Sequence, residues 1–329
     1  MLGVQMLGSS QVTVREFPDP VPAKGQVLVR ITASGLCGSE LKGYRAEGER
    51  EFNAGHEAAG EVVEANGCHR FQPGERVGLH AVHGCGKCRW CAQGKYTFCP
   101  DKVGIGGTHA ELVAVPEHTC LPLPEGVPDD VGVLLSGDGL GVPYHVGKYL
   151  QTRGGEVVVV IGCGPIGLGN ILVQNFYGAE VIAIDVLEPR LALATELGAN
   201  HVINSAETDP VAAVRDLTHG MLAAKCVEAV GKPETVKLAL QLAGNAGTVM
   251  ACGEQGDVPV NIGADLIRRD ITLRGAWFFH FYEFYEMVDL HSRGLWAEKL
   301  ITHHFPLSEA GEAFAKFAAG ETGKVVLQP

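Results

Sequence analysis

Four cysteines in the segment GCGKCRWCAQGKYTFC are the residues of this chain most able to do chemistry: Cys85, Cys88, Cys91 and Cys99. Gaps of two, two and seven residues separate them, which is short enough to bring four thiolates around one ion. Tetrahedral zinc with four sulfur ligands is structural, because no coordination position stays open. An iron–sulfur cluster is the alternative, but the ferredoxin pattern places three residues before its last cysteine and shares ligands between two clusters. A disulfide pair is disfavoured because nothing else marks the chain as secreted, so we predict a structural zinc.

Length and composition set the class of protein. The 329 residues predict two domains, and the 46% hydrophobic and 19% charged content is typical of a soluble enzyme. A net charge of −12 argues against nucleic acid and anionic membranes as partners. The start, MLGVQMLGSS, has no basic signal-peptide region, and no later segment approaches the ~18 apolar residues that span a bilayer. Ten cysteines in such a chain indicate reduced thiols, so we expect a cytoplasmic protein.

The chain has two different textures. Up to about residue 135, glycine and proline alternate with short β-branched runs, which is typical of a small β-barrel-like domain. From Glu156 onward, apolar strands alternate with helical segments, which is typical of an α/β fold with a doubly wound parallel sheet. The expected strands cover 27–31, 60–63 and 112–115 in the first region, and 157–161, 180–185, 201–203, 225–229, 247–252 and 271–275 in the second.

A glycine-rich turn follows the first apolar strand of the second region. Its glycines permit a tight turn, the close approach of a pyrophosphate and close packing of the next helix, whose N-terminus offers free N–H groups to phosphates. This pattern predicts a dinucleotide site. The expected cofactor-binding residues are Gly162, Gly164, Pro165, Ile166 and Gly167.

Asp185 lies 18 residues after the last of these glycines, at the end of the second expected strand. Its carboxylate can accept both hydroxyls of the adenosine ribose and repels a 2′-phosphate, which favours NAD over NADP. The alternative is an aspartate that caps a helix or stabilises a loop. Arg190, five residues further on, could flank the adenine or tolerate a 2′-phosphate.

Several motifs occur in a specific order along almost the whole chain. They are G-x-C-G-S around Cys37, G-H-E around His56, P-G-E-R-V at 73–77, the four-cysteine segment, the glycine-rich turn and the ending GKVVL at 323–327. In this combination the chain resembles the zinc-dependent medium-chain alcohol and polyol dehydrogenases, including the sorbitol and secondary-alcohol dehydrogenases. The resemblance implies a mostly β, GroES-like catalytic domain of residues 1–142 and 280–329, and an NAD-binding Rossmann domain of residues 143–279.

The same resemblance implies a second, catalytic zinc, which makes two zinc ions per chain. Cys37 and His56 match two of its ligands, although a lone cysteine or histidine is more often a packing or surface residue. Asp138 matches the third ligand, and its alternative role is to cap the helix expected to start near residue 140. Ser39 matches a residue that takes the substrate proton, and Glu57 matches a carboxylate behind the zinc.

Two positions depart from the family pattern. Lys42 replaces a histidine that often ends the proton relay, and Glu40 replaces an aspartate near the histidine ligand. The expected function is hydride transfer between NAD and a secondary alcohol, polyol or sugar-type substrate, in a homodimer or homotetramer. The alternatives are a biosynthetic NAD(P)H-dependent ketone reductase and a non-catalytic nucleotide-binding protein.

Overall fold

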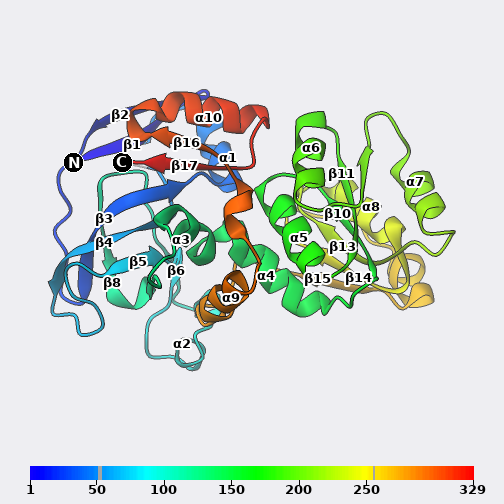
Figure 1. Cartoon of the computed structure of the whole chain (residues 1–329), viewed down its shortest axis with the longest axis horizontal. Helices are drawn as coiled ribbons and strands as arrows, with labels where there is room; N and C mark the ends of the chain where they lie inside the picture. Colours follow the sequence, from blue (N-terminus) through cyan, green and yellow to red (C-terminus); the bar gives the residue numbers. More distant parts are fainter. Residues whose placement is uncertain (51–53, 255) are drawn as a thin grey trace. The chain divides into compact units, whose positions relative to one another are not determined.

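The computed structural model describes residues 1–50, 54–254 and 256–329, which form two compact units. The first unit, called the barrel unit here, comprises Met1–Gly141, Phe279–His291 and Trp296–Pro329. The second, called the sheet unit, comprises Val142–Phe278 and Ser292–Leu295. Figure 1 shows the elements of both.

A seven-stranded sheet is the centre of the barrel unit. Its order is β16-β17-β3-β4-β5-β9, and β8 also pairs with β3. Alternate residues of β3, such as Val27, Val29 and Ile31, are buried in one apolar core, as the period-two pattern predicts. The strands are β3 (Gln26–Gly35), β4 (Glu57–Asn66), β5 (Arg76–Leu79), β8 (Leu112–Pro116), β9 (Cys120–Pro122), β16 (Ile301–Pro306) and β17 (Lys324–Gln328).

Strand β4 begins three residues earlier than the β-branched run predicts. Its first residues are small, and Gly60 lies where a Cβ would overlap the carbonyl oxygen of Arg30 on β3. Small residues carry little strand signal, so the close approach of two strands hides the start of β4 from the sequence pattern.

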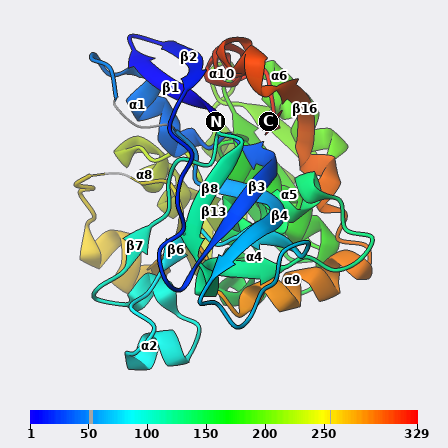
Figure 2. The ribbon, with the colours of Figure 1, turned by 90° about the vertical axis from the view of Figure 1, so that its left-hand side faces the viewer.

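Smaller elements complete the barrel unit. Figure 1 shows α10 lying along β1, β2 and β16, where it covers a second apolar core. Figure 2 shows α2 in a loop that projects from the sheet. The bounds are β1 (Leu2–Gly8), β2 (Gln11–Glu16), α1 (Leu41–Arg45), β6 (Val82–His83), α2 (Arg89–Ala92), β7 (Val103–Gly104), α3 (Asp129–Ser136), α9 (Glu283–Ser292) and α10 (Ala310–Ala319), with α4 (Asp138–Leu150) leading into the sheet unit.

The sheet unit has a six-stranded parallel sheet in the order β12-β11-β10-β13-β14-β15. This is the order of the doubly wound dinucleotide-binding fold, so the predicted fold class is confirmed. Helices α7 and α8 pack on one face, and Figure 1 shows α5 and α6 on the other side. The elements are β10 (Val157–Ile161), α5 (Pro165–Phe176), β11 (Glu180–Asp185), α6 (Glu188–Glu196), β12 (His201–Asn204), α7 (Pro210–Leu217), β13 (Ala223–Glu228), α8 (Pro233–Leu242), β14 (Ala243–Ala251) and β15 (Thr272–Gly275).

Most strands of this sheet lie within one or two residues of their expected ranges. The central strands β10 and β11 match best, because they are continuous apolar runs that are buried on both faces. Strand β14 is the exception, since it begins at Ala243 rather than near residue 247. Its first part, AGNAG, has no apolar run to announce it. Across the described residues, no helix is long and apolar enough to cross a membrane.

Candidate functional site

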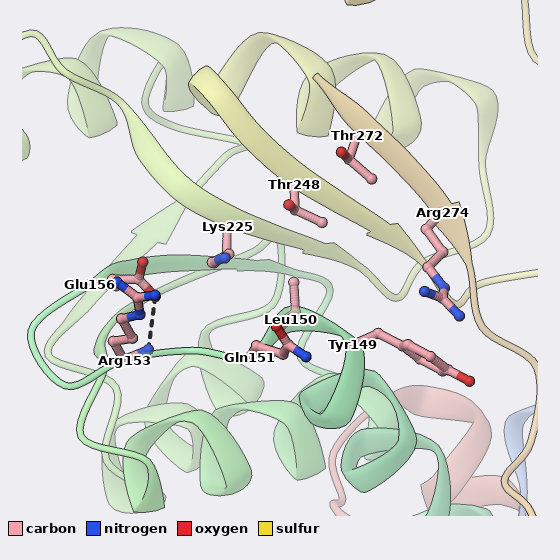
Figure 3. Close-up of a pocket in the computed structure, with 9 residues that line it drawn as sticks. All are labelled: Tyr149, Leu150, Gln151, Arg153, Glu156, Lys225, Thr248, Thr272 and Arg274. Atoms are coloured by element: carbon pink, nitrogen blue, oxygen red, sulfur yellow. Dashed lines mark hydrogen bonds between the residues drawn. The ribbon is translucent and has the colours of Figure 1, made fainter. Parts of the chain in front are cut away.

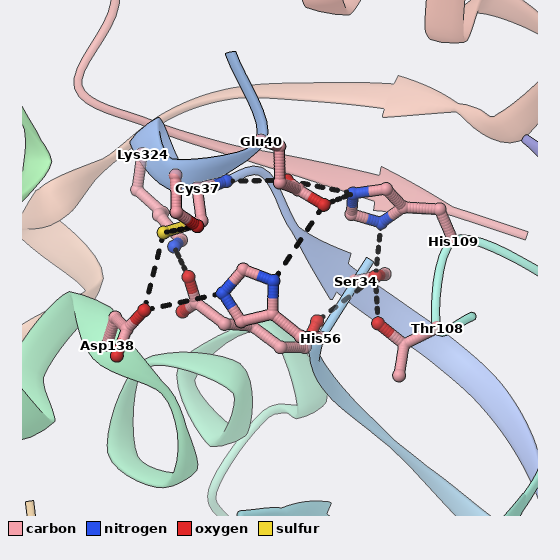
Figure 4. A network of polar contacts seen from close by, with 10 residues as sticks. Ser34, Cys37, Glu40, His56, Thr108, His109, Asp138 and Lys324 are labelled. Carbon is pink, nitrogen blue, oxygen red and sulfur yellow. Dashed lines mark hydrogen bonds and ion pairs between the residues drawn. The ribbon is translucent and has the colours of Figure 1, made fainter. Parts of the chain in front are cut away.

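Four side chains from three widely separated segments converge in the barrel unit: Cys37, His56, Glu57 and Asp138. Cys37 follows β3, His56 and Glu57 lie at the start of β4, and Asp138 is the first residue of α4. One ligand atom from each lies within 4.8 Å of all the others. Figure 4 shows Cys37, His56 and Asp138 pointing toward one another. We call these four residues the reactive cluster.

The distances within the reactive cluster fit a tetrahedral zinc ion. The Oδ2 atom of Asp138 lies 3.3 Å from the Sγ atom of Cys37 and 3.4 Å from the Nε2 atom of His56. Zinc bonds of 2.0–2.3 Å at tetrahedral angles place neighbouring ligand atoms about 3.3–3.8 Å apart. The donor set of thiolate, imidazole and carboxylate is also one that catalytic zinc accepts, with a fourth position left for water or substrate.

Two glycines make this convergence possible. Gly55 has φ +101°, a left-handed conformation that side chains disfavour, and a Cβ there would also meet the Thr108 hydroxyl at 2.6 Å. It turns the chain so that His56 enters the cluster. Gly137 separates α3 from α4, and a Cβ there would meet the Glu57 Oε2 atom at 2.5 Å. Asp138 can therefore start a new helix directly beside Glu57.

The electrostatics of the reactive cluster call for a cation. Burial raises the pKa of the Cys37 thiol to about 11, and the Asp138 carboxylate adds to the effect. Burial also raises the pKa of Glu57. Although burial opposes it, the contact with Asp138 raises the pKa of His56 above its usual value. Positive charge is thus favoured at the centre, and a bound metal ion would supply it.

Lys324 is the buried partner of Glu57, a role that its place in the sequence did not predict. Its Nζ atom lies 2.5 Å from the Glu57 Oε1 atom, and both side chains are almost fully buried. Although burial opposes it, Glu57 raises the pKa of Lys324 above its usual value. The Glu57 Oε2 atom has no hydrogen-bond partner among the described residues. A lysine in the apolar strand GKVVL is the signal that could have found this pair.

Glu40 and His109 form a second buried support. The carboxylate of Glu40 accepts the Cys37 backbone N–H at 2.9 Å and lies 3.9 Å from the His56 Nδ1 atom. The Glu40 carboxylate also lies 3.1 Å from the His109 Nε2 atom. On the other side of that ring, the His109 Nδ1 atom lies 2.7 Å from the Ser34 hydroxyl. The sequence pointed to Glu40, but no local signal marked His109 or Ser34. Figure 4 shows the continuous network.

Ser39 and Lys42, at the two positions of the expected proton relay, differ in their distance from the reactive cluster. Ser39 is exposed, and its hydroxyl lies 3.3 Å from the Cys37 Sγ atom. Lys42 is exposed on α1. The Ser39 hydroxyl therefore borders the reactive cluster, whereas the Lys42 side chain extends into solvent.

The four other candidate ligands, Cys85, Cys88, Cys91 and Cys99, also converge, and we call them the cysteine lobe. The Sγ atoms of Cys88 and Cys91 are 3.5 Å apart, and the Cys85 backbone N–H points to the Cys99 Sγ atom at 3.3 Å. Backbone N–H contact from Cys91 lowers the pKa of the Cys88 thiol to about 7, while burial raises that of Cys91 to about 12. Four sulfurs at this spacing suit a closed zinc site.

The glycine-rich turn lies at the carboxyl end of β10 and leads into α5. Gly162 has φ +89°, and a Cβ at Gly167 would overlap the Gly162 carbonyl oxygen. The helix begins at Pro165, and Ile166 follows it in the first turn. The backbone thus has the tight turn and close helix packing that the motif predicts.

Asp185 ends β11 next to this turn. Its Oδ2 atom accepts the Cys163 N–H at 2.7 Å, and its Oδ1 atom accepts the Val186 N–H at 2.7 Å. The Arg190 guanidinium lies 3.9 Å from the same carboxylate. The Oδ1 atom also accepts the Leu187 N–H at 3.0 Å. Asp185 therefore ties the two loops together, and its Oδ2 atom, which accepts a single N–H, retains a lone pair for a further hydrogen bond.

Comparison with known proteins adds to this geometry. The profile "Alcohol dehydrogenase GroES-like domain" matches residues 23–125, and the profile "Zinc-binding dehydrogenase" matches residues 165–293. The chain is 32% identical to the uncharacterized zinc-type alcohol dehydrogenase-like protein YphC of Escherichia coli K12, over 99% of this chain and 98% of that one. It is also 32% identical to L-threonine 3-dehydrogenase of Symbiobacterium thermophilum, over 96% of this chain and 94% of that one.

Solved structures agree with these sequence matches. Alcohol dehydrogenase TADH from Thermus sp. ATN1 superposes with a TM-score of 0.91 at 29% identity, covering 100% of this chain and 99% of that one. An Escherichia coli CFT073 alcohol dehydrogenase complexed with cofactor NADH gives a TM-score of 0.88 at 26% identity, covering 100% and 99%. The chain therefore belongs to the zinc-dependent medium-chain alcohol and polyol dehydrogenases, which are NAD-dependent oxidoreductases.

Proposed function

We propose that Cys37, His56 and Asp138 hold the catalytic zinc of this enzyme and that the cysteine lobe holds a second, structural zinc. The observation that carries the proposal is the convergence of three donors from three separate segments. The Asp138 Oδ2 atom lies 3.3 Å from the Cys37 Sγ atom and 3.4 Å from the His56 Nε2 atom. A binding protein that had lost its activity would need none of these three side chains. The proposal includes the catalytic role of the barrel unit and the nucleotide-binding role of the sheet unit.

The substrate side of the proposal is a secondary alcohol, polyol or sugar-type compound. Zinc bound at the reactive cluster would act as a Lewis acid that stabilises the alkoxide of the substrate. Cys37 and Asp138 contribute two negative charges and His56 a neutral donor, so the donor set balances the charge of the ion. The Ser39 hydroxyl, at the edge of the cluster, can relay the proton that the alcohol loses: its oxygen accepts that proton while its own proton passes to the solvent to which it is exposed. A relative named L-threonine 3-dehydrogenase supports a secondary hydroxyl as the reacting group.

The cofactor side rests on the glycine-rich turn and Asp185. The free N–H groups at the start of α5 would receive the pyrophosphate. The free lone pair of the Asp185 Oδ2 atom would accept a ribose hydroxyl, and the charge of the carboxylate would repel a 2′-phosphate. Titration with both cofactors tests this assignment: we expect NAD to bind more tightly than NADP. Equal affinities in the unmodified enzyme would contradict it.

Two measurements test the proposal as a whole. Elemental analysis of protein purified without chelator should give two zinc ions per chain, and a panel of secondary alcohols, polyols and their ketones should show NAD reduction or NADH oxidation at 340 nm. One zinc per chain, or iron, would contradict the two-site assignment. A full panel without turnover in zinc-loaded protein would contradict the reaction. We further propose a cytoplasmic homodimer or homotetramer, which sedimentation of the purified protein can check.

A further inference from the structure

A polar cavity of about 480 Å³ lies in the sheet unit, away from the glycine-rich turn. Small-molecule sites measure about 300–1,000 Å³, so the volume suits a ligand. Glu156, in the lining, directly precedes β10, whereas Gly162 directly follows it. The five residues of β10 separate these two ends of the strand by about 15 Å. The cavity is therefore distinct from the nucleotide-binding turn.

Three polar side chains form a row across the floor of this cavity. Lys225, Thr248 and Thr272 pair with one another in register on β13, β14 and β15. Residues in register point to the same face of a sheet, and Figure 3 shows all three beside the cavity. Their neighbours Cys226 and Val249 point to the opposite face and are buried in the apolar core. The polar strip is therefore confined to one face of these strands, and it lies beside the cavity.

Positive charge dominates the lining. Figure 3 places Arg153 and Arg274 at opposite ends of the row, so three cations face one carboxylate, Glu156. That carboxylate already accepts the Arg153 backbone N–H at 2.8 Å. The Arg274 guanidinium stacks 3.2 Å from the Tyr149 ring centroid, which fixes its direction.

The donors of the cavity have no protein acceptor. Within the described part of the chain, the side chains of Lys225, Arg153 and Arg274 make no ion pair or hydrogen bond, and the hydroxyls of Thr248 and Thr272 make no hydrogen bond. Five unpartnered donor groups thus line one hollow in a chain of net charge −12. A concave surface with cations of one sign concentrates anions.

We propose that this cavity binds a small, multiply charged oxyanion, of the phosphate or dicarboxylate type. The two guanidiniums can each grip two oxygens, the Lys225 ammonium supplies a point charge at the centre, and the threonine hydroxyls donate the remaining hydrogen bonds. The ligand would stabilise the sheet unit, since anything that binds only the folded state raises its stability.

Calorimetric titration of the zinc-loaded enzyme tests the proposal, with inorganic phosphate and succinate as separate probes. Saturating NAD fills the nucleotide site, so that phosphate cannot bind at the glycine-rich turn, and sodium chloride keeps the ionic strength constant. We expect saturable binding of at least one probe. The probe that binds more tightly tells whether the site prefers a phosphate or a dicarboxylate.

Three variants assign any binding to the cavity. Lys225→Gln should weaken the affinity for the anion by about tenfold, because it removes a charged hydrogen bond. Thr248→Val should weaken it by about threefold, because it removes a neutral one. Lys237→Gln is the matched control, because Lys237 is exposed on α8 outside the lining and its loss changes the net charge equally. It should bind like the unmodified enzyme. Circular dichroism checks that each variant folds. If Lys225→Gln does not fold, the affinity of Thr248→Val still tests the proposal.

Three results would overturn the proposal. The first is the absence of saturable binding with either probe. The second is an equal loss of affinity in Lys225→Gln and Lys237→Gln, which would indicate a general charge effect. The third is a change in molecular mass on sedimentation of Lys225→Gln without any change in phosphate or succinate affinity. That pattern would assign the row to contact with a second copy of the chain.

Discussion

The reactive cluster and the cysteine lobe lie in the same unit but are built in opposite ways. The lobe takes all its ligands from one short segment, Cys85–Cys99, whereas Cys37 and Asp138 of the reactive cluster are 101 residues apart. The lobe uses four identical thiols, and the reactive cluster mixes thiol, imidazole and carboxylate. A local site can form wherever its loop forms. A dispersed site exists only when the whole fold brings its parts together.

The two sites also differ in what holds their ligands. Backbone N–H groups surround the thiols of the lobe. Buried charged side chains, Lys324 and Glu40, support the reactive cluster. The backbone N–H groups are in place once the local turn has formed. A buried charge, in contrast, destabilises the fold unless it is paired with an opposite charge. The lobe is therefore suited to stability, and the reactive cluster keeps its charges in place for chemistry.

The sharpest test of this contrast is Asp138→Ala. The change removes one ligand from the reactive cluster and leaves the lobe and the fold untouched. We expect zinc content to fall from two ions to one and turnover to fall by about a thousandfold or more, since the metal supplies several kcal/mol of transition-state stabilisation. Elemental analysis, steady-state kinetics and melting temperature of one variant give all three quantities.

Asp209→Ala is the matched control, because Asp209 caps the start of α7, where its carboxylate accepts the Val211 N–H at 3.0 Å. If Asp138 only stabilised the start of α4, both variants would lose about 1 kcal/mol of stability and keep zinc and turnover. Retained zinc with near-normal activity in Asp138→Ala would remove it from the ligand set.

Cys88→Ser tests the other half of the comparison. A structural zinc contributes directly to folding free energy, so loss of one thiolate should lower the melting temperature by about 10 °C. Turnover measured well below that temperature should be largely kept. Cys68→Ser is the control, since Cys68 is a free cysteine outside both clusters. Equal melting temperatures for the two variants, or a loss of turnover without a loss of stability, would reverse the roles assigned to the sites.

Lys324→Met tests whether buried charge supports the reactive cluster. Removing one member of a buried ion pair costs about 3–5 kcal/mol, because Glu57 would be left buried and unpaired. Denaturant unfolding should show this loss, and the double variant Lys324→Met with Glu57→Gln should recover most of it. The pair is structurally irrelevant if the single variant unfolds like the unmodified protein.

The same contrast explains what the sequence could predict. The cysteine spacing, the glycine-rich turn and the continuous apolar strands are local patterns, and the structure contains the corresponding elements where they were expected. The partnership of Lys324 with Glu57 joins positions 267 residues apart, and that of His109 with Glu40 joins positions 69 apart. No spacing in the sequence encodes such pairs, because they depend on which strands become neighbours in the sheet. The polar row at Lys225 was missed for the same reason.

The smallest expected difference between the two regions is their response to acid. His80 packs beside Tyr96, which lies between the lobe residues Cys91 and Cys99, with ring centroids 5.9 Å apart. Burial lowers the pKa of His80 to about 4. Although burial opposes it, His109 holds the pKa of Glu40, which supports the reactive cluster, at about 2. A histidine with a lowered pKa stabilises the fold fully above its ordinary value of 6.5, and this contribution is lost as the pH falls from 6.5 to about 4. Glu40 loses its contribution only below its ordinary value of 4.5.

Mild acid should therefore weaken the surroundings of the lobe before it weakens the reactive cluster. Between pH 6.5 and 4 the unfolding free energy should fall by up to about 3 kcal/mol more in the unmodified protein than in His80→Gln, whose side chain cannot take up the proton. Unfolding in denaturant at several pH values measures that difference. Hydrogen exchange at pH 5 should rise first in peptides covering residues 82–99, and an earlier rise in peptides covering residues 34–40 would place the acid-sensitive support in the reactive cluster instead.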